Sequence, residues 1–225
     1  MPGWNLSALI DHTILRPDAT KVEVIQLCQE AKAKRFTVIF VPPCYIDEAV
    51  AAVAGTSIRV GIPIGFPLGW HSTQTKVAEA VDAVTHGAQV LDMVLNVSRL
   101  KSGDHDYVRT DIAEVVQATP NVEHKVILET CYLTQQEKRS ACNLVIEAGA
   151  DYVKTSTGFG AAGATVEDVR LLKETVAGRV KVKASGGIRD WKTTLAMLEA
   201  GADRIGTSAS LKILDEWWMA SYKRT

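Results

Sequence analysis

The chain lacks several features that would assign it to a class at once. Its 25 basic and 26 acidic residues leave a net charge of −1, which supplies no long-range attraction for nucleic acid or anionic lipid. No apolar run approaches the roughly 18 to 20 residues that span a bilayer. The opening MPGWNLSALID lacks the basic segment and apolar run of a signal peptide. We therefore expect a cytoplasmic protein that binds neither nucleic acid nor membrane.

Cysteine is scarce and unpaired in spacing. The four cysteines lie far apart and form no CxxC pair: Cys28, Cys44, Cys131 and Cys142. In a chain of 225 residues this pattern favours reduced thiols over a disulfide framework or a zinc site. His12 has no second histidine or cysteine at ligand spacing. We therefore predict that the protein holds no metal.

Linkers and low-complexity tracts are also missing, so nothing marks a domain boundary. The chain instead alternates short β-branched apolar runs with longer amphipathic segments. Near-continuous apolar runs are typical of strands buried on both faces of a parallel sheet. Eight strand–helix units and no GxGxxG after the first strand favour a single (β/α)8 TIM barrel of the α/β class over an open doubly wound sheet. The expected strands cover 10–15, 37–41, 58–64, 89–94, 124–129, 151–155, 180–184 and 203–207, and residues 1–225 form one domain.

Helix starts and ends follow from local signals. A threonine three residues before an acid can cap a first turn, and this occurs at Thr20, Thr134 and Thr165. A glycine just past a helix can adopt the left-handed conformation that ends it, and this is expected at Gly87, Gly149 and Gly201. The recurrence of these signals fits one strand–helix unit used repeatedly.

Two lysines end neighbouring strands of the expected barrel. Lys154 closes the sixth strand and Lys183 lies at the matching height on the seventh. A lone lysine at a strand end can extend its ammonium group to the rim. Two ammonium groups about 6 Å apart repel by roughly 3 kcal/mol at an effective dielectric near 20, which together with burial can make one amine neutral near pH 7. A neutral lysine is what Schiff-base chemistry requires. Lys181 shares a strand face with Lys183, and the deeper position of Lys183 favours it.

Other polar residues interrupt apolar strands. Asp92 lies among apolar neighbours on the fourth strand, where it is either the partner of a buried cation or a proton carrier. On the first strand, Asp11 and Thr13 share a face and could hold substrate hydroxyls, whereas His12 is more typical of a hydrogen-bonded core histidine.

Glycine-rich turns follow the last two strands. Ser185–Arg189 and Gly206–Ser210 lead directly into helices, where backbone amides can approach an anion. Loops in these positions of a barrel often bind phosphate, although tight turns alone would also require glycine. Together with the lysine pair and the acid, they predict a cofactor-free Schiff-base aldolase or lyase that acts on a sugar phosphate.

At these residues the sequence resembles the deoxyribose-phosphate aldolases, a family of class I aldolases. The motifs that carry the resemblance are IDHTILRPDAT near the start, IGFPLG at 64–69, LDMVLN at 91–96, KVILET at 125–130, VKTSTGF at 153–159, VKASGGIR at 182–189 and RIGTSAS at 204–210. The resemblance implies reversible cleavage of 2-deoxy-D-ribose 5-phosphate to acetaldehyde and D-glyceraldehyde 3-phosphate, a place in deoxyribonucleotide catabolism, no cofactor, and a homodimer.

The resemblance also implies residue roles. Lys154 is the Schiff-base nucleophile, Lys183 lowers its pKa, and Asp92 transfers protons. The residues implied to bind substrate are Asp11, Thr13, Phe66, Thr155, Thr157, Gly158, Gly186, Gly187, Gly206 and Ser208.

The sequence departs from the family pattern at several positions. Phe159 stands where some members have a lysine, and Ala209 where some have a second serine, so both changes concern the phosphate pocket. A tail tyrosine takes part in proton transfer in some members, but Tyr222 lies in a terminal segment that we expect to fray. A transaldolase-like or keto-acid aldolase activity remains an alternative, as does a phosphosugar-binding barrel without catalysis. Paired strand-end lysines favour catalysis, because binding alone would not need them.

Overall fold

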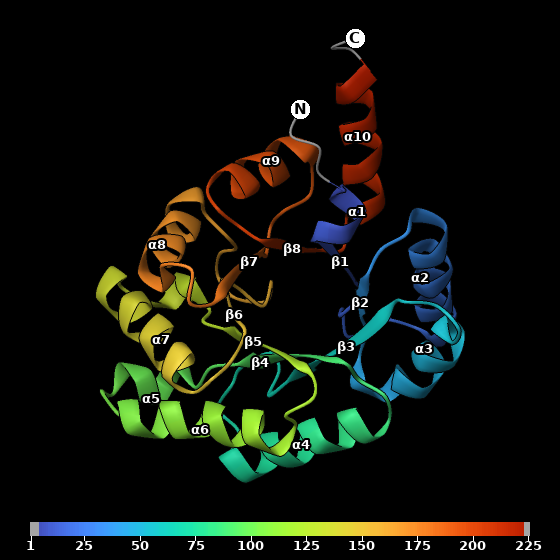
Figure 1. Ribbon diagram of the computed structural model, residues 1–225. Helices are drawn as coiled ribbons and strands as arrows, with labels where there is room; N and C mark the ends of the chain where they lie inside the picture. The colour runs from blue at the N-terminus through green and yellow to red at the C-terminus, as the bar shows by residue number, and fades with distance from the viewer. Residues whose placement is uncertain (1–4, 223–225) are drawn as a thin grey trace.

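The computed structural model describes residues 5–222 and confirms the barrel. Eight parallel strands close in chain order, each paired with its sequence neighbours, and β1 pairs with β8 (Figure 1). All eight expected strands are present, with ends shifted by at most a few residues. Their bounds are β1 Ile10–Thr13, β2 Val38–Phe40, β3 Arg59–Ile64, β4 Val90–Val94, β5 Glu123–Ile127, β6 Tyr152–Lys154, β7 Lys181–Ser185 and β8 Arg204–Thr207. That residues 1–225 form a single domain stays a prediction.

Helices surround the strands as a ring, and α10 projects from that ring at the top of Figure 1. No helix within residues 5–222 is both long and apolar enough to cross a bilayer. The helix bounds are α1 Leu6–Leu9, α2 Lys21–Lys34, α3 Ile46–Val53, α4 Thr73–Thr85, α5 Val97–Lys101, α6 His105–Ala118, α7 Gln135–Glu147, α8 Val166–Val176, α9 Trp191–Glu199 and α10 Ser210–Tyr222, with short 3-10 turns η1 Pro43–Tyr45 and η2 Thr130–Tyr132. Tyr222 ends α10, and its side chain lies outside the described part of the chain.

The expected helix signals are present. Thr20 and Thr134 form complete capping boxes with acids three residues later, and the Thr165 hydroxyl accepts the amide of Asp168. Gly87, Gly149 and Gly201 have φ values of 102°, 84° and 108°, the left-handed conformation that favours glycine. These turns return the chain to the start of the next strand, so every strand points the same way.

The barrel interior is unusual because charged groups fill much of it. TIM barrels are typically packed with branched apolar side chains. Here Val38, Phe40 and Val90 form a small apolar cluster, separate from the main core between strands and helices. The remaining buried interior holds carboxylates, lysines and an arginine: Asp11, Asp92, Lys125, Lys154, Lys183 and Arg204. Buried charges are costly unless paired, so this arrangement points to chemistry at the barrel mouth.

A second buried ion pair fixes the end of β4 from outside the barrel. Lys76 on α4 is fully buried, and its Nζ donates to Asp111 Oδ2 of α6 at 2.6 Å and to the Val94 carbonyl at 3.0 Å. The Thr73 hydroxyl donates to the other Asp111 oxygen at 2.9 Å. The pair therefore ties two helices to the strand that carries Asp92.

Replacing Lys76 with methionine is expected to lower the free energy of unfolding by about 3 to 5 kcal/mol, because the Asp111 carboxylate then stays buried without its cation. Urea unfolding at neutral pH measures this loss as a lower midpoint at an unchanged slope. The matched control is Lys212→Met, since Lys212 on α10 is exposed and its pair with Glu216 spans one helical turn at 3.6 Å. We expect the control to change stability by less than about 1 kcal/mol. Equal losses in the two variants would contradict a structural role for the buried pair.

Candidate active site

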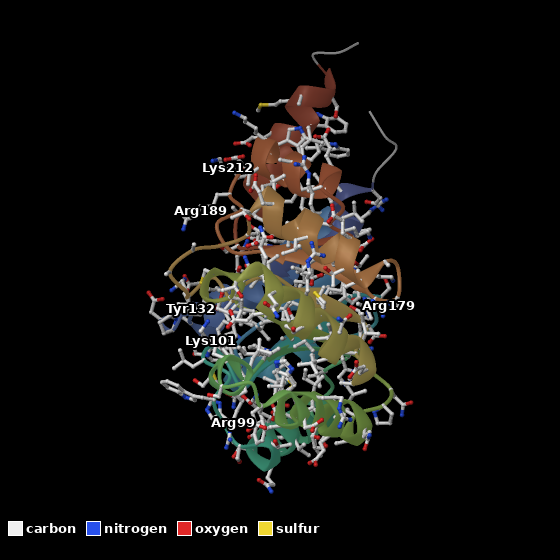
Figure 2. The ribbon with its side chains drawn as sticks, turned by 90° about the vertical axis from the view of Figure 1, so that its left-hand side faces the viewer. Arg99, Lys101, Tyr132, Arg179, Arg189 and Lys212 are labelled. Carbon is white, nitrogen blue, oxygen red and sulfur yellow. The ribbon has the colours of Figure 1, made fainter. Side chains whose placement is uncertain are left out.

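A cavity of about 540 Å³ opens where the strands end at their carboxyl termini. Residues from β1, β6, β7 and β8 and from the loops that follow them line it, with α2 on one side. Arg189, which lines this cavity, lies on the left of Figure 2, whereas Arg179, which precedes β7, lies on the right. Eight of the residues expected to form the site line this cavity: Thr13, Lys154, Thr157, Gly158, Gly186, Gly187, Gly206 and Ser208.

Lys154 and Lys183 meet at one carboxylate oxygen at the base of this cavity. The two residues are register partners on β6 and β7, as their matching heights predicted. Both Nζ atoms lie 2.6 Å from Asp92 Oδ2. Lys154 lines the cavity, whereas Asp92 and Lys183 have exposed fractions of 0% and 1% and lie below it. Lys181 is exposed at the start of β7, so Lys183 is the lysine of that strand inside the barrel.

The surroundings shift the pKa values of the two lysines in opposite directions. Burial lowers the pKa of Lys154 to about 8; the Lys183 charge acts in the same direction and the Asp92 charge opposes it. Burial alone would also lower the pKa of Lys183, but Asp11 and Asp92 outweigh it and raise that pKa. Burial favours the neutral form of Asp92, yet the surrounding lysines hold its pKa well below the usual range. Of these two lysines, Lys154 is therefore the one that more readily becomes a free amine, beside a charged Lys183 and an ionised Asp92.

A second layer of charge lies beneath this trio, and sequence reasoning gave most of it no role. Lys125 on β5 is fully buried, contacts Glu123, and lies 3.9 Å from Asp92 Oδ1. Arg204 Nε donates to Asp11 Oδ1 at 2.6 Å, and Asp11 Oδ2 lies 2.5 Å from Lys183 Nζ. The signal for Lys125 was present in the sequence, because a lysine that starts an apolar strand run is as unusual as Lys154.

The ring of Phe40 forms an apolar wall against these cations. The Nζ atoms of Lys183, Lys154 and Lys125 lie 4.1, 5.6 and 5.7 Å from its centroid. Gly61 on β3 makes room for the ring, because a Cβ there would lie 2.6 Å from a ring carbon. The aromatic face stabilises nearby ammonium groups and keeps water away from them.

Asp11 and Thr155, two residues expected to bind substrate, do not line the cavity. Asp11 is fully buried and forms ion pairs with Lys183 and Arg204. Thr155 is also fully buried; its hydroxyl donates to the Ser185 carbonyl at 2.9 Å and accepts the Ser185 amide at 3.0 Å. Both residues position the strands that carry the lysines, and no substrate contact is proposed for them.

Phe66 and His12 border the site in different ways. Phe66 packs edge-to-face against Phe159, which lines the cavity, with ring centroids 5.4 Å apart. His12 stacks on Phe36 at 4.6 Å, and its Nε2 lies 3.1 Å from Glu30 Oε2. This is the hydrogen-bonded core histidine that its position in the first strand favoured.

The glycine turns form the side of the cavity next to Lys154. Gly186 and Gly187 have φ values of 89° and 76°, and a Cβ on Gly163 would lie 2.1 Å from the Gly186 carbonyl oxygen. Gly206 leaves space for Lys183, whose Cε would lie 2.9 Å from a Cβ there. Arg189, an exposed residue after these turns, also lines the cavity, and sequence reasoning did not assign it. Amides and an arginine are together a chemistry suited to phosphate.

Comparison with known proteins gives this geometry a family. The family model described as DeoC/LacD family aldolase matches residues 6–216. The chain belongs to the DeoC/LacD aldolase family. A deoxyribose-phosphate aldolase from Thermoanaerobacter sp. (strain X514) is 54% identical to this aldolase over 216 residues, which cover 95% of this chain and 97% of the relative.

Solved structures agree with that assignment. The structure titled "QR15, an Aldolase" superposes on this aldolase with a TM-score of 0.92 at 43% identity, covering 97% of this chain and 98% of that one. A deoxyribose phosphate aldolase from Aeropyrum pernix, described as a unique tetramer, gives a TM-score of 0.89 at 32% identity and covers 96% and 92% of the two chains. The family and the barrel are thus established together.

Proposed function

We propose that this aldolase reversibly cleaves 2-deoxy-D-ribose 5-phosphate into acetaldehyde and D-glyceraldehyde 3-phosphate through a Schiff base on Lys154. The observation that carries the proposal is the position of Lys154, which lines the cavity with a lowered pKa and shares Asp92 with a second lysine. The relative from Thermoanaerobacter is named for this activity, and the alignment covers 97% of its length. The lysine is the electron sink, so the proposal requires no cofactor.

The reaction begins at the aldehyde carbon. The neutral Lys154 amine attacks C1 of the open-chain sugar, and loss of water from the carbinolamine leaves a protonated imine. The C3 hydroxyl then loses its proton and becomes the carbonyl of the leaving aldehyde as the C2–C3 bond breaks. The electron pair of that bond forms the C1=C2 double bond, and the C=N π electrons move to nitrogen, which gives an enamine. Glyceraldehyde 3-phosphate leaves, the enamine takes a proton at C2, and water releases acetaldehyde and the free lysine.

Asp92 is placed to move the protons of these steps. Its Oδ2 lies 2.6 Å from both Nζ atoms, so a proton can pass between Lys154 and the carboxylate while Lys183 holds the carboxylate in place. Lys183 stays charged beside Asp11, and its charge favours the neutral form of Lys154. We propose Lys154, Lys183 and Asp92 as the catalytic residues on this basis.

The glycine side of the cavity is proposed to hold the phosphate. Thr157, Gly158, Gly186, Gly187, Gly206 and Ser208 would offer backbone amides and hydroxyls to the phosphate. Thr13, and Phe66 through its contact with the cavity-lining Phe159, would border the sugar. Phe159 stands where some family members have a cation, and Arg189 on the loop after the neighbouring strand β7 can supply one. The phosphate pocket therefore keeps a positive charge by a different residue.

Turnover of 2-deoxyribose 5-phosphate with coupled detection of both products tests the proposal. Pyruvate-yielding and dihydroxyacetone-yielding sugar phosphates, tested in parallel, distinguish the keto-acid and transaldolase-like alternatives. We expect both acetaldehyde and glyceraldehyde 3-phosphate to appear in equal amounts. Turnover of another donor class only, or binding without turnover, would contradict the proposed substrate.

Arg189→Ala is expected to raise KM for 2-deoxyribose 5-phosphate by about 10- to 100-fold, because a charge-assisted hydrogen bond contributes about 1.5 to 3 kcal/mol. The kcat/KM for unphosphorylated 2-deoxyribose should not change, because that substrate lacks the charge that Arg189 would meet. Arg179→Ala is the matched control at the opposite end of the barrel (Figure 2). Equal losses with both substrates would place the phosphate elsewhere.

A homodimer stays part of the proposal. Trp217 packs against the core of the barrel, whereas Trp218 on the same helix is 63% exposed. Trp218 could join a contact between two copies, and light scattering at assay concentration reports the oligomeric state directly.

A further inference from the structure

Glu129 adopts a conformation that its surroundings must enforce. It follows β5 with φ 53° and ψ 63°, a left-handed conformation that is disfavoured for residues other than glycine. Among residues 5–222 the other two non-glycine residues with positive φ are Arg35 and Ala177, which end helices, where this conformation is common. Glu129 instead lies between a barrel strand and the turn η2, at the carboxyl end of the barrel. Such strain is found at functional sites when other contacts hold it in place.

The side chain of Glu129 binds the loop that follows the proposed nucleophile. Its carboxylate is 4% exposed, and its two oxygens accept the Thr157 amide, each at 3.2 Å. The Thr157 hydroxyl also donates to Glu129 Oε2, and the same hydroxyl accepts the Phe159 amide at 3.0 Å. One carboxylate thus organises three consecutive residues, all of which line the cavity.

The loop after Thr157 packs closely against the Glu129 carboxylate. Gly160 packs against the carboxylate, and a Cβ there would lie 3.1 Å from Glu129 Cδ and 3.0 Å from Cys131 Sγ. Thr130, the next residue, donates its amide to the Thr155 carbonyl at 3.0 Å, which joins the same two segments through the backbone. Burial raises the pKa of Glu129, while its bonds to Thr157 act in the opposite direction.

We propose that Glu129 is a positioning residue that holds Thr157–Phe159 in the conformation that receives the substrate phosphate. The inference rests on the proposed function, since it assigns the glycine side of the cavity to a phosphorylated sugar. Without the carboxylate, the Thr157 amide loses its acceptor, and the Thr157 hydroxyl that accepts the Phe159 amide is no longer held in place. The loop then no longer presents Gly158 to the anion. Lys154 precedes the loop on β6 and keeps its contact with Asp92.

The experiment compares Glu129→Ala with Glu129→Gln on two substrates. We expect Glu129→Ala to raise KM for 2-deoxyribose 5-phosphate by about 10- to 100-fold while kcat falls less than about threefold, consistent with loss of a buried charged acceptor. The kcat/KM for unphosphorylated 2-deoxyribose should stay within about threefold of wild type. Glutamine keeps one oxygen for the Thr157 amide, so Glu129→Gln should recover most of the lost affinity.

Asp151→Ala is the matched control. Asp151 accepts the His124 amide at 2.8 Å and joins β5 to β6 at their amino ends, away from the cavity. Both alanine variants remove a carboxylate–amide bond at an end of the β5–β6 pair, so both lower the melting temperature, but only Glu129→Ala should change KM. A normal KM in Glu129→Ala, or an equal loss of kcat/KM with both substrates, would overturn the positioning role.

Two further measurements keep this test separate from the proposed function. Reductive trapping of acetaldehyde on Lys154 should proceed at the wild-type rate in Glu129→Ala, because it does not involve the phosphate. Absence of deoxyribose-phosphate cleavage in the wild type would instead defeat the proposed function.

Double substitution of Glu129 and Thr157 should raise KM by less than the product of the two single increases, since both substitutions remove the same Glu129–Thr157 contact. Independent effects of the two substitutions would contradict the proposal.

Discussion

Lys154→Met is expected to reduce kcat/KM for 2-deoxyribose 5-phosphate by at least about 10⁴-fold, because Lys154 is the one lysine among the described residues that line the cavity. Methionine keeps the length and apolar stem of lysine but has no nucleophilic nitrogen. Asp92 keeps Lys183 as its partner at 2.6 Å, so the buried carboxylate stays paired and the barrel should fold. Initial rates at high enzyme concentration over a range of substrate concentrations measure the residual kcat/KM, and circular dichroism checks the fold.

Lys212→Met provides the control for loss of a lysine. Lys212 lies on α10 outside the barrel mouth (Figure 2), with a side chain 62% exposed, and its loss should leave the rate unchanged. A folded Lys154→Met protein that retained more than about a hundredth of the activity would show that Lys154 is not the nucleophile.

Asp92→Asn is expected to affect both catalysis and stability. The rate at the optimum should fall by about 10² to 10⁴-fold, because asparagine cannot carry the proton between the lysines and the substrate. The free energy of unfolding should fall by about 3 to 5 kcal/mol, because the buried lysines lose the carboxylate they share. Kinetics and urea unfolding measure the two effects on the same protein.

The pH profile of Asp92→Asn separates proton transfer from charge balance, because the two roles predict different changes. The Asp92 charge raises the pKa of Lys154, so its removal should lower that pKa below about 8 and move the acid limb of the rate profile to lower pH. Free amine becomes more abundant while turnover becomes slower. Asp104→Asn is the control, since Asp104 pairs with exposed Arg99 at 2.8 Å and should contribute less than about 1 kcal/mol. An unchanged rate would show that Asp92 only balances charge.

Much of the fold was predictable because local signals and barrel topology agree. The threonine caps and terminal glycines bound the helices, and the apolar runs between them leave little choice but parallel strands. The lysine pair was also predictable, because neighbouring strands of a barrel align by register and Lys154 and Lys183 occupy equal heights. Asp92 followed from the cost of an unpaired carboxylate on a buried strand.

Depth inside the barrel was the part that sequence could not supply. Alternation places Asp11 and Thr13 on one face, but only the structure shows that Asp11 lies a layer below and serves Lys183 and Arg204. Thr155 was predicted from a family motif, although its parity puts it on the opposite face from Lys154. Strand alternation alone would have excluded it from the cavity.

Loop residues were missed for a different reason. Arg189 follows a glycine turn, and nothing in its neighbours predicts that it lines the cavity. Glu129 ends a strand run with no unusual composition, and its role depends on a positive φ and on a loop 28 residues away. Long-range contacts of this kind are set by the packing of the whole barrel mouth.

Reductive trapping tests the central claim most directly. Borohydride added with acetaldehyde should fix a two-carbon adduct, and peptide mass mapping should place that adduct on Lys154. Lys154→Met should remain unlabelled under the same conditions. An adduct on Lys183, Lys125 or a surface lysine in place of Lys154, or no adduct at all, would contradict the account.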